Sequence, residues 1–253
     1  YIGEHSVVLE DTASVLAKKI DADLIAIAQQ FEAVSYPLLL NFGNPLARDA
    51  STDGNGRILI LFTPKVNQLT TSILGFVAAC DLYPVSQDPS VAGSNEAEIF
   101  YARTVTDTSA GSTSLNGRSQ WRRQMPATMI HEAKHIASYA ERLSRGATQF
   151  EQIWLEEATA QVASEMFGRA IHGNTWRGDA TYRQTLYCEA RPTEAGCAAG
   201  VIAMSNHFSF LSDYLQRFET KSILSGAEDS DIYGSAWLFT RWLLDTYGGN
   251  DEG

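Results

Sequence analysis

The residues that could do chemistry begin with His131-Glu132-Ala133-Lys134-His135, which follows the pattern H-E-x-x-H. On an α-helix, positions i and i+4 lie on one face, one turn apart. Two imidazoles in this arrangement can bind one Zn²⁺ ion, each through a nitrogen about 2.0–2.1 Å from the metal. Glu132 lies beside the first histidine, where its carboxylate can serve as a general base toward a metal-activated water. The pattern therefore predicts a hydrolytic zinc site.

The pattern is rare enough to be informative. In a chain with five histidines, about 0.01 matches are expected by chance. The flanking residues Met129, Ile130, Ala133 and Ile136 give the segment the apolar spacing of a packed helix. The alternative is a surface helix that carries two solvated histidines.

A catalytic zinc needs a third protein ligand and an open position. No further histidine follows closely enough for the longer H-E-x-x-H-x-x-G-x-x-H pattern. Glu156 and Glu157 instead open an apolar segment that reads as a second helix, from which a carboxylate could return to the metal. They point about 100° apart, so only one can face the ion, and the spacing leaves both open. Either could also be a first-turn glutamate favoured by the helix dipole.

The secondary-structure elements that must position these residues are predicted to be strands in the first half of the chain and helices in the second. This order indicates an α+β fold and not a fold of alternating βαβ units. A first helix is expected from Thr12 to about Tyr36, capped by Asp11 or Thr12 and ended by Pro37. The remaining expected elements are strands at 57–62, 73–79 and 98–102 and helices at 126–143, 151–170, 203–221 and 234–247. Pro126 is expected in the first turn of its helix.

Composition narrows the class of partner. The 253 residues include 19 Lys and Arg against 30 Asp and Glu, a net charge of −11, which argues against nucleic acid as the main partner. No apolar run approaches the ~20 residues of a membrane span. The chain starts at Tyr1 and not at Met, so we expect that a signal peptide has been removed. Cys188 and Cys197 flank a short Pro/Gly loop and could form a disulfide, which favours an exported protein; the alternative is reduced thiols.

The segment Trp154-Leu155-Glu156-Glu157-Ala158-Thr159-Ala160 resembles the W-L-x-E-x-x-[AS] pattern that supplies the glutamate ligand in gluzincin metallopeptidases. The register of this resemblance makes Glu157 the ligand and Glu156 the variable position. More narrowly, the chain from about residue 12 to 250 is similar to the hyicolysin-type neutral zinc metallopeptidases of bacteria. Of the matching segments, only H-E-x-x-H and W-L-x-E are specific by themselves.

The resemblance implies one metallopeptidase catalytic domain, 1–253, with a zincin-like fold of the thermolysin type. A small mixed sheet and the N-terminal helix would lie over the active-site helix in an upper part (about 1–143), and the lower part (about 144–253) would be mainly helical. The implied function is that of a secreted bacterial zinc endopeptidase acting on a protein or peptide. The alternatives are a non-catalytic binding domain of the same fold and a protease dedicated to one partner. In that fold, the strand at 98–102 could be an edge that pairs with bound peptide, or an ordinary sheet strand.

The resemblance also suggests a donor to the oxyanion of the tetrahedral intermediate. Tyr233, which opens Tyr-Gly-Ser-Ala-Trp-Leu-Phe, loosely matches the tyrosine of aminopeptidase N relatives. A phenol suits this role because it can donate a hydrogen bond to developing negative charge. His207 and His172 are rival donors, and a packing role is the alternative for all three.

Overall fold

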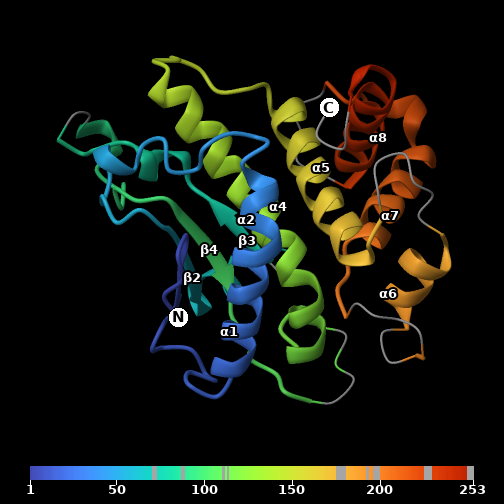
Figure 1. Cartoon of the computed structure of the whole chain (residues 1–253), viewed down its shortest axis with the longest axis horizontal. Helices are drawn as coiled ribbons and strands as arrows, with labels where there is room; N and C mark the ends of the chain where they lie inside the picture. The colour runs from blue at the N-terminus through green and yellow to red at the C-terminus, as the bar shows by residue number, and fades with distance from the viewer. Residues whose placement is uncertain are drawn as a thin grey trace. The chain divides into compact units, whose positions relative to one another are not determined.

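The computed structural model describes residues 1–69, 73–86, 89–109, 112, 114–174, 181–191, 194–195, 200–224 and 230–249. The chain is a mixed α+β protein that divides into two compact units, Tyr1–Phe150 and Glu151–Gly253 (Figure 1). The strands all lie in the first unit, and the described part of the second unit is helical.

The first unit is built on a four-stranded mixed sheet in the order β1-β2-β4-β3. Its strands are β1 (Ser6–Glu10), β2 (Ile58–Thr63), β3 (Gly75–Val77) and β4 (Ile99–Arg103). β1 and β4 both pair with β2 in parallel, whereas β3 pairs with β4 antiparallel. Its helices are α1 (Asp21–Gln30), the π-helical turn η1 (Phe31–Ser35), α2 (Tyr36–Leu39), α3 (Pro64–Asn67) and α4 (Arg118–Ser144), with short 3-10 turns at Asp49–Ser51, Ala79–Leu82 and Pro89–Val91.

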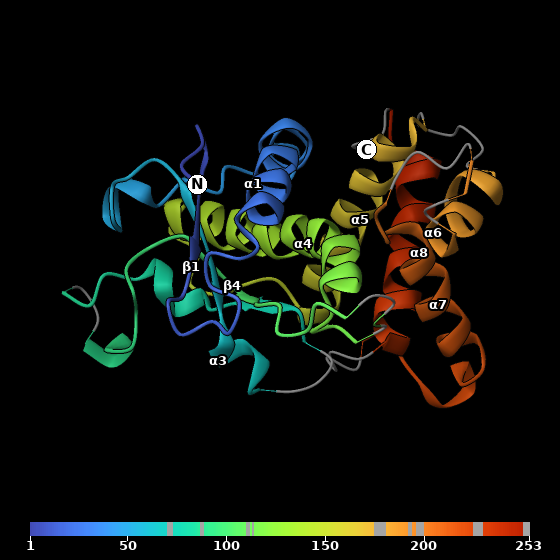
Figure 2. The same ribbon diagram turned by 90° about the horizontal axis from the view of Figure 1, so that it is seen from below.

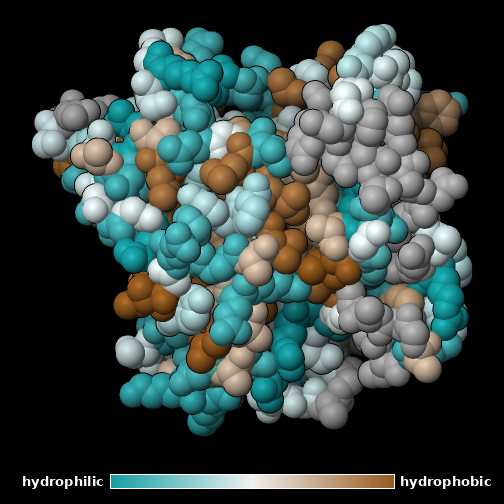
Figure 3. All heavy atoms as spheres, viewed as in Figure 1, coloured by the Kyte–Doolittle hydropathy of each residue, from teal (hydrophilic) through white to brown (hydrophobic). Residues whose placement is uncertain are grey.

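The core of this unit lies between the sheet and two helices. Along β2, Ile58, Ile60 and Phe62 are almost fully buried, in the alternation expected of a strand with one face on a core. α1 and α4 cover that face of the sheet (Figures 1 and 2). On the face of this unit shown in Figure 3, hydrophobic residues are interspersed among hydrophilic ones. The apolar residues that specify the fold are therefore mainly interior.

The first helix differs from its predicted bounds. Residues before Asp21 form successive turns, and Asp11 accepts hydrogen bonds from the Ala13 backbone (2.8 Å) and the Thr63 hydroxyl (2.7 Å) instead of capping a helix. The helical path then continues through Pro37 to Leu39. The π-helical turn η1 ends at Ser35, two residues before this proline, and a wider turn gives room for a ring that would clash in a regular α-helix.

The expected start of the active-site helix at Pro126 is also wrong, because α4 begins eight residues earlier, at Arg118. Trp121 and Met125, in this added part, are both fully buried. Burying each such side chain contributes about 1.5–3 kcal/mol, which can offset the roughly 3 kcal/mol cost of an interior proline. Trp121 also donates a hydrogen bond to the Arg103 carbonyl (2.8 Å), which ties α4 to the end of β4.

The strand before α4 is not an edge of the sheet. β4 has β2 on one side and β3 on the other, so of the two alternatives for residues 98–102 the structure supports an ordinary sheet strand and not an edge open to bound peptide. β3 takes the edge position instead. The parallel pairing of β1 with β2, linked through α1, adds one βαβ unit to a chain whose order is otherwise α+β, as predicted. β1 was missed because its five residues alternate only weakly in hydropathy.

The second unit packs α8 (Ser230–Tyr247) against α5 (Ile153–His172) and α7 (Met204–Leu215). Its shorter helical segments are Arg183–Tyr187, Cys188–Ala190 and Phe218–Thr220. A Cβ atom at Gly234 would lie 2.3 Å from the backbone of Phe210 and Leu211, so glycine permits the close approach of α8 to α7. Cys197 lies outside the described residues, and its disulfide with Cys188 stays a prediction.

A buried ion pair with an added hydrogen bond holds α8 against α5. The Glu165 side chain, on α5, accepts hydrogen bonds from the Trp237 indole and the Arg241 guanidinium, both on α8 and both at 2.9 Å. Both charged residues are buried, so each compensates the desolvation of the other. Across the described residues, no helix is long and apolar enough to cross a membrane.

Candidate functional site

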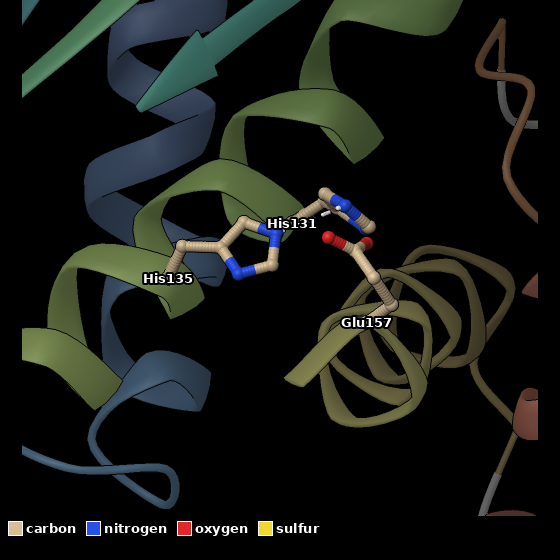
Figure 4. A group of neighbouring side chains, drawn as sticks. All are labelled: His131, His135 and Glu157. Atoms are coloured by element: carbon tan, nitrogen blue, oxygen red, sulfur yellow. Dashed lines mark hydrogen bonds between the residues drawn. The ribbon is translucent and has the colours of Figure 1, made fainter. Parts of the chain in front are cut away.

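The two histidines of the motif lie together on α4. Their Nε2 atoms are 3.3 Å apart, and their rings meet edge to face, with centroids 4.9 Å apart and planes at 82°. Met129, Ala133 and Ile136, on the other side of the helix, are buried. Because that side faces the core, the positions of His131 and His135 one turn apart direct both imidazoles to the same place (Figure 4).

Glu132 lies on α4 directly after His131 and is half-buried. The predicted helical setting of the whole motif is therefore present in the structure.

The two candidate glutamates lie in the first turns of α5, and both are buried, with 4% exposure for Glu156 and 8% for Glu157. Both glutamates belong to the second unit, whereas His131 and His135 belong to the first. Figure 4 draws Glu157 with the two histidines, the three residues that the family resemblance implies as metal ligands.

The predicted oxyanion donors lie in the second unit. Tyr233 is in the first turn of α8, half-buried, with its ring edge-on to Phe210 (5.7 Å between centroids). His207 is buried on α7, stacked on Trp237 at 5.0 Å, with Nε2 3.5 Å from the Ser164 hydroxyl. These contacts give His207 a packing role.

His172 is also engaged within the second unit. Its Nε2 lies 3.2 Å from Glu189, whose carboxylate accepts hydrogen bonds from the backbone N–H groups of Met204 and Ser205 at the start of α7. Glu189 is 1% exposed, and these hydrogen bonds lower its pKa against the opposing effect of burial. The His172–Glu189 pair therefore helps to position the start of α7.

Sequence reasoning missed a second acidic group in the first unit. Oxygens of Asp49, Asp53 and Glu98 lie within 4.8 Å of one another. Asp53 belongs to the segment Asp-Gly-Asn-Gly-Arg (53–57), whose glycines and asparagine are typical of a turn, and Asp49 lies four residues before it. The Thr52 hydroxyl lies 3.0 Å from both carboxylate oxygens of Glu98 and can donate to this group.

Glu98 is fully buried, and this burial raises its pKa to about 7. The hydrogen bond from Thr52 opposes the rise, whereas the negative charges of Asp49 and Asp53 add to it. Folding therefore favours the protonated form of this carboxyl group.

Comparison with known proteins finds no matching family model, no matching curated protein and no matching solved structure. The function proposed below therefore rests on the sequence motif and on the geometry of the histidines.

The raised pKa of Glu98 predicts a specific pH dependence of stability. The folded state keeps the Glu98 proton between pH 4.5 and about 7, where the unfolded chain loses it, so the free energy of unfolding should fall as pH rises through this window. Glu98→Gln should remove this component, on the order of 1–3 kcal/mol, as measured by urea unfolding from pH 4 to 8. The control Glu4→Gln changes an exposed carboxylate and should behave as wild type. Equal pH dependence in wild type and Glu98→Gln would contradict the assignment.

Proposed function

We propose that this chain is a zinc-dependent peptidase of the gluzincin type, with His131, His135 and Glu157 as metal ligands. The observation that carries the proposal is the 3.3 Å separation of the two histidine Nε2 atoms. Two nitrogens about 2.0–2.1 Å from a tetrahedral zinc are about 3.3–3.4 Å apart. The distance between the two Nε2 atoms is therefore that of two ligands of one zinc ion.

The donor set also fits a catalytic site better than a structural one. Structural zinc sites in proteins use four protein ligands, commonly with cysteine, whereas two histidines and one glutamate leave a position open. The proposed ligands are two histidines and one glutamate, with no cysteine among them. Zinc bound in this way supplies a Lewis acid and lowers the pKa of water toward ~7.

The remaining chemistry falls to side chains of the chain itself. Glu132, next to a ligand and half-buried, is proposed to accept a proton from the attacking water and to pass it to the leaving amine. Tyr233 remains the proposed oxyanion donor because its phenol can donate a hydrogen bond to developing negative charge.

The substrate proposed is a protein or peptide that is cut internally, since the sequence lacks an exopeptidase signature such as G-x-M-E-N. A thermolysin-type zincin fold and secretion from a bacterium complete the proposal. The small mixed sheet packed on a long helix that carries H-E-x-x-H is consistent with such a fold.

The proposed ligand set predicts which glutamate controls metal content. Purified wild type should hold about one zinc per chain by elemental analysis, and Glu157→Ala should lose it because one of three protein ligands is removed. Glu156→Ala, the adjacent buried glutamate of the same helix, is the matched control and should retain zinc. Loss of zinc in Glu156→Ala with retention in Glu157→Ala would reverse the assignment.

The proposed role of Glu132 predicts that metal binding and turnover can be separated. Glu132→Gln should keep zinc and lose at least about 100-fold in the rate of cleavage of an unstructured protein such as casein, since a general base contributes about 10²–10⁴-fold. Retained cleavage would exclude Glu132 as the base. Wild type that binds zinc but cleaves no member of a diverse peptide library would favour a binding domain instead.

A further inference from the structure

The imidazole of His135 is covered by a second aromatic ring of the same helix. Tyr139 follows His135 by four residues, and the two rings stack with centroids 6.0 Å apart and planes at 18°. The ring of His131 also contacts this imidazole, and it meets it edge-on. His135 is only 6% exposed, whereas Tyr139 is half-buried. Tyr139 therefore contributes to the burial of the His135 ring.

Such a cover matters because the ring torsion of histidine is soft. The χ2 angle of histidine has a broad distribution, so the side chain alone does not fix the plane of the imidazole. The lone pair of Nε2 lies in that plane and points wherever the plane directs it. An aromatic ring stacked on one face restricts the plane and hence the direction of the lone pair.

Tyr139 is itself held by Phe150, with ring centroids 4.7 Å apart. Phe150 returns to the helix because the chain reverses at the end of α4. Gly146, with φ +76°, donates a backbone hydrogen bond to Leu143 (3.0 Å), and Ala147 donates one to Arg142 (2.9 Å). This is the pattern of a Schellman turn, in which glycine takes the left-handed conformation at low cost.

The returning segment is fixed by a further contact. The Arg142 guanidinium Nε donates a hydrogen bond to the carbonyl of Gln149 (3.2 Å), the residue directly before Phe150. The order of contacts runs from the turn to Phe150, from Phe150 to Tyr139, and from Tyr139 to His135. All of these residues lie in the first unit.

We infer that Tyr139 is a positioning residue for the metal site, and that Phe150 and the turn at Gly146 hold it in place. The inference rests on the proposed function, because it assigns His135 as a metal ligand. In this arrangement the tyrosine ring restrains the imidazole before a metal arrives, so binding needs less ordering of the ligand. The positioning role is assigned to the aromatic ring of Tyr139 and not to its hydroxyl group.

The test measures zinc affinity in variants of the full chain by competition with a chromophoric chelator. Tyr139→Leu removes the ring and should weaken zinc binding about tenfold, since residues that orient metal ligands are worth about 10–100-fold in affinity. Tyr139→Phe keeps the ring and should bind zinc as wild type does. Phe150→Leu should weaken binding in the same direction by less, and it decides the question if Tyr139→Leu does not fold.

A second readout follows the geometry of the site. In the Co²⁺-loaded protein, the visible absorption of the metal should change in Tyr139→Leu and should match wild type in Tyr139→Phe. The matched control is Tyr36→Leu, which removes another tyrosine stacked on a histidine, His5, at 3.9 Å and 17°. This control should leave zinc affinity and the Co²⁺ spectrum unchanged.

The outcomes separate this inference from the proposed function. Wild type that binds neither Zn²⁺ nor Co²⁺ overturns both. Wild type that binds zinc, with equal affinity and an unchanged spectrum in Tyr139→Leu, overturns the positioning role alone. An equal loss of affinity in the Tyr36→Leu control also overturns it, because the effect would then be general destabilisation.

Discussion

The constraint on which the rest of the first unit depends is that one helix, α4, serves the core and the candidate site together. One side of this 27-residue helix packs beneath the sheet, and the other carries both histidines. Since the interior of a protein is close-packed, the helix cannot rotate without loss of its core contacts. The packing of α4 in the core thus fixes the direction of the two imidazoles. The interior Pro126 is tolerated because the helical turns before it bury Trp121 and Met125.

The second unit contains buried acidic side chains whose charge must be compensated. Glu165 is compensated by Arg241 and Trp237, and Glu189 by the backbone N–H groups that open α7. Buried carboxylates are costly unless they meet positive charge or hydrogen-bond donors. For Glu157, the positive charge in our proposal is the metal ion itself. The same requirement then links folding of α5 to the function proposed for its first turns.

Local patterns predicted the parts of the structure that are determined locally. The position of the two histidines on one helix face follows from spacing alone, and α5 and α8 follow from the periodicity of their apolar residues. The errors came from contacts between segments distant in sequence. The covering of β4 by β3 and the pairing of β1 with β2 depend on sheet topology, which no short pattern encodes. Tyr139 was overlooked for a similar reason: its i+4 spacing from His135 is visible, but its support by Phe150 is known only once the chain reverses.

The most direct measurement of the central claim is a crystal structure of the zinc-loaded protein with anomalous data collected at the zinc absorption edge. The account predicts one anomalous peak about 2.0–2.2 Å from His131 Nε2, His135 Nε2 and a Glu157 carboxylate oxygen. Fewer than four protein ligands should be present, which leaves a position for water or substrate. A zinc ion held through Glu156, or bound away from the two histidines, would contradict the account.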